Sequence, residues 1–498
     1  MNNIPLPLMA DFYKMTHYSQ YPKDIAFSTS YYIPRKSRGE FDYVVTFGIT
    51  GYIDEFLENN FFNIPKADIL DQYKIVLDEC LGENTYDITH IEELYNLGYL
   101  PLRIRGIPEG ERVPIGVPIL EISNTVAGFA WLPLMLESVM QSELWHTMIA
   151  ATVADQFKSI VCKYKTLTGG TKPESTYLGD FGFRGAESYH SAITTGAAWL
   201  TQFINTSCIP AIMWTKEHYK GVNYGSIGKG AVSTEHSCMC SNYAIDRNEM
   251  VHFKRLITEI YPNANFSCVC DSYDYVNFVT EIIPKCYNEI INHNGTIYIR
   301  GDSGDPVDVV TWTLQSLWNT FGGYTVLDNL GNEFKVLNDH IRVIYGDSIT
   351  FDSIGKIYEW CYQNKFSIDN VVLGVGAFSF QAYIGNGKIS PYTRDTVGVA
   401  VKMTNMIMND SSEYPIYKQP IGDSSKKSPR GCIKIFKDAG KWMSEDCLVK
   451  HTYMEDSCKK TVDRYNANWL VIYFENGNRP YKPSMEEIRN KLNKLNRQ

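Results

Sequence analysis

Five short apolar runs that each end in aspartate or glycine constrain the fold of this chain more than any other feature. The runs are STYLGDFGFRG, NFSCVCDSYD, GTIYIRGDSGDP, HIRVIYGDSI and NVVLGVGAF, and a helical pattern follows most of them. Strands that alternate with helices are typical of parallel α/β folds, in which the carboxyl ends of the strands form a shared mouth where substrates bind. We therefore predict an irregular α/β barrel-like catalytic domain over residues 127–390.

The segments on either side have a different sequence pattern, which is typical of β-strands joined by turns. Residues 40–125 mix short apolar runs with Pro-Glu-Gly and Pro-Ile-Gly turns, and β-type alternation returns after Arg394 in TVGVAVKMT and GCIKIF. A chain of 498 residues also exceeds the size at which a single core stops growing. We predict a second, discontinuous and mostly antiparallel β domain over 1–126 and 391–498, with a mobile loop at 409–428.

Composition narrows the class of partner. The 47 Lys and Arg against 56 Asp and Glu give a net charge of −9, which argues against nucleic acid as a partner, so any anion site is local.

The start resembles no signal peptide and no apolar run reaches about 18 residues, so we expect a cytoplasmic protein with no membrane partner. Cys238/Cys240 and Cys268/Cys270 are C-x-C pairs rather than the C-x-x-C pairs of structural zinc sites, and buried thiols are the expectation.

The loop after TIYI carries the densest combination of chemical groups. Arg300-Gly-Asp302-Ser-Gly-Asp-Pro306 joins a bidentate anion binder to carboxylates and two flexible backbone positions, a mixture that a sugar phosphate requires. Asp302 could hold ribose hydroxyls or Mg²⁺, and Arg300 could meet a phosphate or cover an aromatic ring. The alternative is an Asp-Gly turn with a surface salt bridge.

Two short glycine loops follow the next strands. Gly346-Asp347 comes after RVIY, and Gly374-Val-Gly376 comes after VVL. Backbone N–H groups in such loops can cradle a phosphate at a following helix start. Ordinary turns have the same composition, and no Walker or dinucleotide fingerprint accompanies these glycines.

Three further segments offer reactive or stacking groups. His236 follows Glu235 and is either a nucleophilic or acid/base histidine or a structural one. Asp271 ends a strand and is either catalytic or part of a helix N-cap. Phe181 and Arg184 could stack on a planar base and bind an anion, or could belong to a glycine-rich turn with a core phenylalanine.

Taken in order, these segments resemble the nicotinamide phosphoribosyltransferase family. The motifs that carry the resemblance are Asp11-Phe-Tyr13-Lys14-x-x-His17-Tyr18-x-Gln20-Tyr21-Pro22, Asp180-Phe-Gly-Phe-Arg184-Gly185, Glu235-His236-Ser237, Asp271-Ser-Tyr-Asp274, Arg300-Gly-Asp302-Ser303-Gly304-Asp305-Pro306 and Gly346-Asp347. The resemblance implies a type II phosphoribosyltransferase fold and a pentosyltransferase of NAD salvage. Such an enzyme uses Mg²⁺ and joins nicotinamide to phosphoribosyl pyrophosphate, giving nicotinamide mononucleotide and pyrophosphate. It also implies a homodimer with shared active sites, and ATP hydrolysis coupled through phosphorylation of His236.

The resemblance assigns a role to each candidate residue. Phe181 would stack on one face of the base, and Tyr13 of the partner subunit on the other. Arg300 would border the base and Asp302 would hold the ribose, while His236 and Asp271 complete the catalytic candidates. The residues implied for the phosphate, diphosphate and ribose groups also include Arg184, Gly346, Asp347, Gly376, Arg394, Lys418 and Lys426, with Arg35 and Lys402 from the partner side.

One position keeps the identity of the base open. Family members that use the amide carry an aspartate shortly after an Asn-Phe pair, where this chain has Ser207 in Gln202-Phe203-Ile-Asn-Thr-Ser207. Serine is closer to the nicotinate-using relatives, because a hydroxyl both donates and accepts and does not repel a carboxylate. Nicotinamide is the predicted base and nicotinate the alternative. A non-catalytic nucleotide-binding protein is the third hypothesis, and a quinolinate-using enzyme, which needs a denser basic pocket, is the fourth.

Overall fold

The computed structural model describes residues 4–38, 40–57, 61–83, 86–221, 223–385, 388–419, 421, 429–447 and 457–496. Lys426 and the rest of 422–428 in the predicted mobile loop lie outside the described residues. The chain forms two compact units, each assembled from segments far apart in the sequence. Unit 1 comprises Met1–Thr152, His218–Lys220 and Thr393–Lys491, and unit 2 comprises Val153–Glu217, Gly221–Tyr392 and Leu492–Gln498.

One long helix contributes to both units. The helix α6 (Glu137–Leu167) follows α5 (Leu132–Met135), and the unit boundary at residue 153 falls inside it. The long helical pattern beginning at Ala127 is confirmed. The compact units place 127–152 with the terminal segments because the first half of α6 packs there. The predicted domain boundaries, 1–126 with 391–498 against 127–390, stay a prediction.

A parallel sheet organises unit 2. Its order is β7-β6-β14-β13-β10-β9-β8, and each neighbouring pair is parallel. All five runs singled out in the sequence are adjacent strands of this sheet, so the predicted α/β class is confirmed. The strands are β6 (Leu178–Asp180), β7 (Asn205–Thr206), β8 (Val232–Ser233), β9 (Phe266–Val269), β10 (Ile297–Gly301), β13 (Ile341–Tyr345) and β14 (Val371–Val375).

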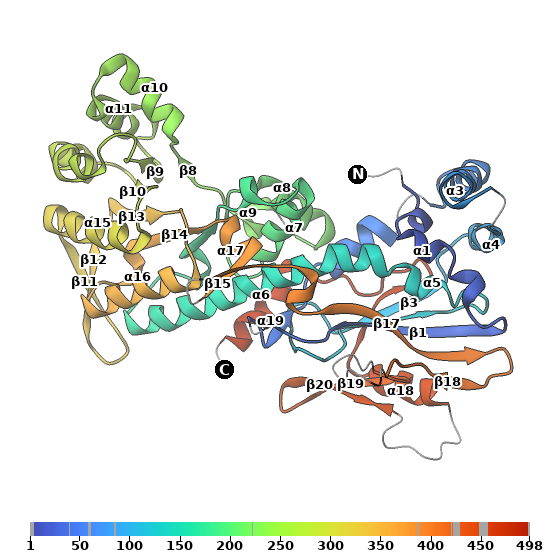
Figure 1. Ribbon diagram of the computed structural model, residues 1–498. Helices are drawn as coiled ribbons and strands as arrows, with labels where there is room; N and C mark the ends of the chain where they lie inside the picture. The colour runs from blue at the N-terminus through green and yellow to red at the C-terminus, as the bar shows by residue number, and fades with distance from the viewer. Residues whose placement is uncertain are drawn as a thin grey trace. The chain divides into compact units, whose positions relative to one another are not determined.

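Helices follow these strands, and local capping explains where the two longest begin. α15 (Pro306–Phe321) starts because the Asp305 side chain accepts hydrogen bonds from two backbone N–H groups and proline occupies the first position. α16 (Phe351–Gln363) starts with a capping box at Thr350. These helices pack together beside the sheet (Figure 1). The others are α7 (Tyr189–Trp199), α8 (Ile209–His218), α9 (Tyr224–Ile227), α10 (His236–Asp246), α11 (Glu249–Arg255), α12 (Tyr275–Asn277), α13 (Ile283–Lys285), α14 (Tyr287–Ile291) and α17 (Ala377–Gln381).

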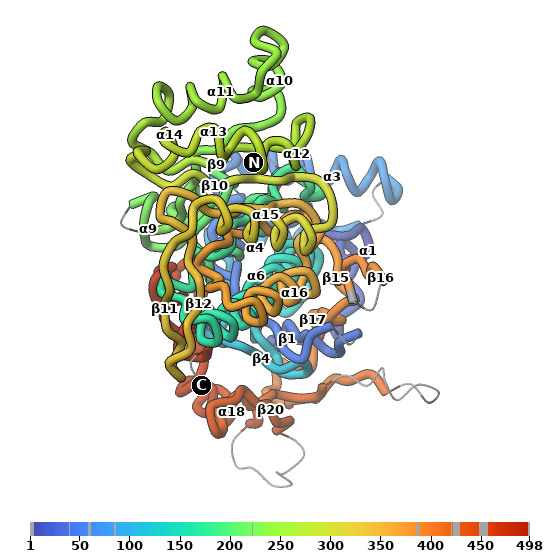
Figure 2. Tube along the Cα trace, turned by 90° about the vertical axis from the view of Figure 1, so that its left-hand side faces the viewer, coloured from blue at the N-terminus to red at the C-terminus, as the bar shows by residue number. Residues whose placement is uncertain are grey.

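Two small antiparallel pairs complete unit 2. β11 (Gly323–Leu327) and β12 (Glu333–Leu337) form a hairpin that lies to one side of α15 and α16 (Figure 2). β15 (Ala382–Gly385) pairs with β16 (Lys388–Pro391). Neither pair contributes a strand to the parallel sheet.

Antiparallel strands from both ends of the chain form the main sheet of unit 1. Its order is β18-β17-β1-β5-β3-β21. β17 pairs with β1, so that Val401 lies opposite Tyr32. The predicted discontinuous, mostly antiparallel domain is confirmed. The strands are β1 (Ile25–Pro34), β3 (Leu102–Gly106), β5 (Leu120–Asn124), β17 (Val399–Met408), β18 (Glu413–Pro415) and β21 (Val471–Glu475).

Helices within 40–125 are a correction to the sequence analysis. That segment was predicted to be turn-rich and antiparallel, yet it contains α3 (Lys66–Leu81) and α4 (Thr89–Leu97). α3 forms because Ile69, Tyr73 and Leu77 recur on one buried helical face. The remaining elements of unit 1 are α1 (Phe12–Met15), α2 (Ile49–Tyr52), β2 (Tyr43–Val45), β4 (Arg112–Pro114), β19 (Ile433–Asp438), β20 (Lys441–Asp446), α18 (Cys458–Asn466) and α19 (Met485–Leu495), whose last residues fall in unit 2.

A buried ion network fastens the main sheet of unit 1 to α18. Arg105 donates from Nε and Nη2 to the two carboxylate oxygens of Glu121, each at 3.0 Å. Lys459 approaches Glu121 Oε1 at 2.9 Å, and the Tyr31 hydroxyl donates to Oε2 at 3.0 Å. Although burial opposes ionisation, the two cations lower the pKa of Glu121 to about 2. The carboxylate is thus charged and fully paired in the core.

No helix in the part of the chain that the structure describes combines the length and apolar character needed to cross a bilayer. The cytoplasmic location expected from the sequence stays a prediction.

Candidate active site

The loop after β6 is shaped by a buried aspartate. Asp180 accepts hydrogen bonds from the Gly182 N–H and the Thr206 hydroxyl, each at 2.8 Å. The pKa of Asp180 is raised, because the effect of burial exceeds the lowering by these two hydrogen bonds. The Ser207 hydroxyl donates to the Asp180 carbonyl at 2.9 Å. The ends of β6 and β7 are therefore held together, and Ser207, just after β7, lies beside the start of the loop that carries the predicted base-binding ring.

That ring, Phe181, rests on glycines at the ends of two other strands. Its backbone N–H donates to the Val375 carbonyl at 2.8 Å. A Cβ on Gly374 would lie 2.2 Å from the ring, and a Cβ on Gly346 would lie 2.6 Å from it. Only glycine permits this close approach, and the half-buried ring keeps exposed surface. Both glycines, predicted from the sequence as part of phosphate loops, serve here as the support of an aromatic ring.

Two carboxylates face the histidine at the start of α10. Nε2 of His236 lies 3.7 Å from Oδ1 of Asp271 and 3.8 Å from Oδ2 of Asp302. Oδ1 of Asp271 is buried and has no hydrogen-bond partner among the described residues. The His236 side chain is 46% exposed, so a ligand can reach it. An imidazole in this position can act as an acid/base group or as a nucleophile.

Arg300 and Asp302 hold each other in a bidentate ion pair. Nε and Nη2 of Arg300 donate to the two oxygens of Asp302 at 3.3 and 2.8 Å, and Nη1 donates to the Ser233 hydroxyl at 3.2 Å. Asp271 Oδ2 accepts from the Asp302 N–H at 2.8 Å and from the Ser303 hydroxyl at 2.6 Å. The loops after β9 and β10 are thereby bonded into one arrangement.

The same edge of the sheet is rich in carboxylates. The pKa of Tyr345, at the end of β13, is raised first by burial and then by the negative charges of Asp347, Asp302, Asp271 and Asp305. Several carboxylates around one hydroxyl supply the hard oxygen ligands that Mg²⁺ prefers. This edge can therefore accept a divalent cation together with a phosphorylated ligand.

The segments that carry Arg184 and Gly376 are neighbours. A Cβ on Gly185 would lie 2.5 Å from that of Ala377, whereas a Cβ on Gly376 would meet nothing within 4 Å in the described structure. The backbone at Gly376 thus borders open space, beside the exposed Arg184. Unit 2 therefore gathers at the carboxyl ends of its strands the predicted residues Phe181, Arg184, Ser207, His236, Asp271, Arg300, Asp302, Gly346, Asp347 and Gly376.

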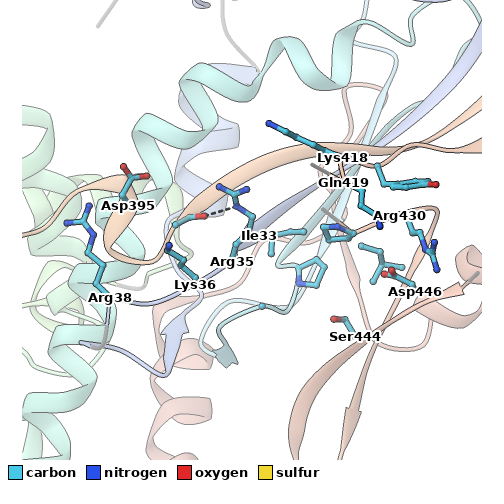
Figure 3. A pocket seen from close by; sticks show the side chains of 16 residues that line it. Ile33, Arg35, Lys36, Arg38, Asp395, Lys418, Gln419, Arg430, Ser444 and Asp446 are labelled. Atoms are coloured by element: carbon cyan, nitrogen blue, oxygen red, sulfur yellow. Dashed lines mark hydrogen bonds between the residues drawn. The ribbon is translucent and has the colours of Figure 1, made fainter. Parts of the chain in front are cut away.

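Unit 1 contains a separate cavity of about 980 Å³ with a basic lining. Arg35 comes from the segment after β1, and its Nε donates to the Gly398 carbonyl at 3.1 Å. Lys418 comes from the segment after β18, on another wall (Figure 3). The charged residues of the lining are Arg35, Lys36, Arg38, Lys418 and Arg430, with Asp395 and Asp446 as the acidic members. This excess of cations suits phosphate groups.

Lys402 and Arg394 extend this positive region. The pKa of Lys402 is lowered first by burial and also by the charges of Arg35 and Arg394, although Glu137 at 3.8 Å raises it. Arg394 forms an ion pair of 2.9 Å with Asp395, which lines the cavity. The sequence analysis missed Lys36, Arg38 and Arg430 as members of the cavity lining. The dense basic run Pro34-Arg-Lys-Ser-Arg38 was a signal for the first two.

Tyr13 lies on the short helix α1 of unit 1. Its side chain is 55% exposed, and that of its neighbour Phe12 is 48% exposed. Lys14 instead points inward and pairs with Glu137 at 2.5 Å. α1 thus presents two aromatic rings on the surface of this subunit. The stacking of Tyr13 on a base bound by a partner stays a prediction.

Comparison with known proteins decides the family. The model of the nicotinate phosphoribosyltransferase (NAPRTase) family matches residues 176–464, and that of the nicotinamide phosphoribosyltransferase N-terminal domain matches residues 5–104. A nicotinamide phosphoribosyltransferase of Acinetobacter baylyi is 34% identical, covering 98% of this chain and 97% of its own. The chain belongs to the nicotinamide phosphoribosyltransferase family. A second relative of that name, from Xanthomonas campestris pv. campestris, is 31% identical over 97% of both chains.

Solved structures agree with the fold of this nicotinamide phosphoribosyltransferase family member. Nicotinate-nucleotide pyrophosphorylase of Pyrococcus furiosus has a TM-score of 0.58 at 13% identity, covering 100% of this chain and 97% of its own. Human nicotinic acid phosphoribosyltransferase has a TM-score of 0.54 at 14% identity, covering 98% and 93%. At such identities the likeness establishes the fold alone, which is that of the type II phosphoribosyltransferases. Family membership makes the chain a phosphoribosyl-transferring enzyme of NAD biosynthesis.

Proposed function

We propose that this enzyme transfers the phosphoribosyl group of phosphoribosyl pyrophosphate to nicotinamide, giving nicotinamide mononucleotide and pyrophosphate for NAD salvage. The observation that carries the proposal is the edge of the parallel sheet in unit 2. There a supported aromatic ring, an arginine–carboxylate pair and a histidine near two carboxylates follow strands of one sheet. Relatives named for this activity match nearly the whole chain, which supports the same substrate.

Each part of the reaction has residues suited to it. Phe181 stacks on the pyridine ring, so that the ring nitrogen is aimed at C1 of the ribose. The nitrogen lone pair forms the new bond to C1 as the bond from C1 to the pyrophosphate oxygen breaks. Asp302, oriented by Arg300, holds the ribose and stabilises the positive charge that develops on it. The reaction therefore needs strong electrostatic positioning and little proton transfer.

Mg²⁺ fits the carboxylate-rich edge as a companion of the diphosphate. The buried Oδ1 of Asp271, which has no hydrogen-bond partner among the described residues, provides a hard oxygen. Asp302 and Asp347 lie in the same carboxylate group near Tyr345. When bound, the cation neutralises charge on the diphosphate leaving group. Asp271, Asp302 and Asp347 are the residues that would hold it.

We further propose a homodimer with shared sites and a cation-lined region that receives phosphate groups. The outward rings of Phe12 and Tyr13 support a role at a contact with a second copy. The basic cavity containing Arg35 and Lys418 supports binding of the phosphates. In this arrangement Tyr13 of the partner subunit covers the face of the base opposite Phe181.

ATP stimulation is expected to depend on His236. In His236→Ala the acceptor nitrogen beside Asp271 and Asp302 is lost, so ATP should no longer accelerate synthesis, while slow ATP-independent transfer persists. Initial rates with and without ATP measure this. Ser241→Ala, an exposed substitution on the same helix, should keep the wild-type stimulation. If ATP accelerates synthesis by His236→Ala as much as by the wild type, His236 has a structural role instead.

Ser207→Asp is expected to shift base preference toward nicotinamide. An aspartate beside the Phe181 loop accepts a hydrogen bond from the carboxamide of nicotinamide and repels the carboxylate of nicotinate. Nicotinate is the second candidate substrate, and the present serine favours it. We expect the ratio of kcat/KM for nicotinamide over nicotinate to rise about tenfold, equivalent to about 1.4 kcal/mol. Ser207→Asn, of similar size but neutral, should shift it less. An unchanged ratio in Ser207→Asp would mean that this side chain does not face the base.

A further inference from the structure

Three cysteines converge in unit 1 although they are far apart in the sequence. Cys432 immediately precedes β19, and Cys447 immediately follows β20, its hairpin partner. The N–H of Cys447 donates to the carbonyl of Cys432 at 3.0 Å, so the two residues lie opposite each other at the open end of the hairpin. Cys458 begins α18, which packs on β19, and Figure 1 shows these elements grouped near β18. The three thiols form one cluster with the buried Val462.

A carboxylate joins this cluster from the edge strand β18. The sulfurs of Cys432 and Cys458 and a carboxylate oxygen of Glu413 all lie within 4.8 Å of one another. The thiol of Cys432 donates to Oε1 of Glu413 at 3.8 Å, and Cys458 packs against Cys432 and Cys447. Bond lengths of about 2.3 Å from Zn²⁺ to sulfur place tetrahedral sulfur ligands roughly 3.8 Å apart. The Glu413 oxygen and the sulfurs of Cys432 and Cys458 therefore need only a small contraction to surround such an ion, whereas the Cys447 sulfur lies outside this group of three and has to turn toward it.

Residues around the three cysteines and Glu413 orient the carboxylate and reduce the negative charge of the cluster. Oε1 of Glu413 accepts hydrogen bonds from the Asn405 side chain at 2.9 Å and from the Lys459 N–H at 3.0 Å. Such outer contacts are what hold a ligating carboxylate in place. The charges of Lys459 and Lys434 act on the thiols of Cys432 and Cys447 respectively. Lys434, together with Lys459, which also pairs with Glu121 and Asp463, reduces the negative charge that three thiolates and a carboxylate retain around one Zn²⁺.

Burial and stoichiometry favour a metal over a disulfide. Cys432 and Cys447 are 0% and 2% exposed, which is the closed environment of a structural site. Three cysteines cannot all pair with one another, and the structure records every cysteine as unbridged within its described residues. The carboxylate supplies the fourth ligand that a tetrahedral zinc site requires.

We propose that Glu413, Cys432, Cys447 and Cys458 bind one Zn²⁺ in a closed, four-coordinate structural site. The ion joins β18, the β19–β20 hairpin and α18. Lys418, which lines the basic cavity, follows Glu413 on the same segment, so the ion also anchors the start of that segment. The long separation of the ligands explains why a search for C-x-x-C pairs does not find the site.

Metal content of the full-length protein tests this directly. The purified chain is incubated with Zn²⁺ alone, freed of excess metal by gel filtration and analysed by mass spectrometry for metals. One zinc per chain is expected, and Co²⁺ in its place should give the intense visible absorption of tetrahedral thiolate coordination. No retained zinc, or a disulfide between any two of the three cysteines in the non-reduced protein, would overturn the proposal.

Variants locate the ion. Competition with a chelator should show zinc affinity at least about 100-fold weaker in Cys458→Ser, since losing a direct ligand exceeds the 10–100-fold effect of outer contacts. Asn405→Ala should fall within that smaller range, and it retains all four ligands if Cys458→Ser does not fold. Cys80→Ser, at an exposed cysteine on α3, is the matched control and should bind as the wild type does. Wild-type affinity in both Cys458→Ser and Asn405→Ala would place the ion elsewhere and overturn the assignment.

Discussion

Asp302→Ala is expected to abolish phosphoribosyl transfer while leaving the fold intact. Asp302 is the carboxylate that Arg300 orients and that faces His236, and the proposed mechanism uses it against the positive charge developing on the ribose. Loss of one preorganised electrostatic contact costs about 10²–10³-fold in rate. Because Ala also releases Arg300 from its bidentate pair, we expect kcat/KM to fall by at least about 10³-fold.

The measurement is the rate of mononucleotide formation, accompanied by circular dichroism to establish that the variant is folded. Asp308→Asn is the matched control, since Asp308 is an exposed carboxylate in the first turn of the helix after the same loop. It should retain wild-type activity. An Asp302→Ala enzyme with near-normal kcat/KM would remove this carboxylate from the ribose site.

Glu121→Ala is expected to destabilise unit 1 by about 3 kcal/mol, because it leaves the buried charges of Arg105 and Lys459 with only the partly exposed Asp463 as a shared carboxylate. The Tyr31 hydroxyl loses its acceptor in the same substitution. Urea unfolding of the full chain measures the free energy lost in the transition of unit 1. Lys74→Ala, which removes a largely exposed pair with Asp78 on α3, should cost no more than about 0.5 kcal/mol.

The same network predicts a pH dependence. Folding lowers the pKa of Glu121 from 4.5 to about 2, so its ionised form is favoured in the native state. The stabilisation from this group is fully present above its ordinary pKa and is lost as the pH falls toward 2. Glu121→Ala should therefore differ most from the wild type at neutral pH and least in acid. Equal stability of the two proteins at pH 7 would contradict the account of this network.

The parallel sheet was predictable because its signal is local. Each of its five central strands is a short apolar run that stops at Asp or Gly, and such residues can be read one segment at a time. Asp271, Arg300 and Asp302 were predicted from the same endings, because parallel strands bring their carboxyl ends to one edge. His236 and Asp302 are 66 residues apart in the sequence. The parallel sheet brings Nε2 of the histidine to 3.8 Å from Oδ2 of the aspartate.

What the sequence missed depends on contacts between segments. The packing of Phe181 on the glycines at 346 and 374 was missed, since nothing local reveals that contact; the predicted role of these loops in phosphate binding stays a prediction. α3 was missed because only Ile69, Tyr73 and Leu77 mark its buried face among many polar residues. The convergence of Cys432, Cys447 and Cys458 likewise depends on a hairpin and a helix packing together.

The most direct test of the proposed reaction is the identity of its product. The purified enzyme is incubated with phosphoribosyl pyrophosphate, Mg²⁺ and an equimolar mixture of nicotinamide and nicotinate, with and without ATP, and the mononucleotide is identified by mass. The account predicts nicotinamide mononucleotide as the main product. Nicotinate mononucleotide as the main product would contradict the account. The substrate would then be nicotinate, the base that Ser207 favours.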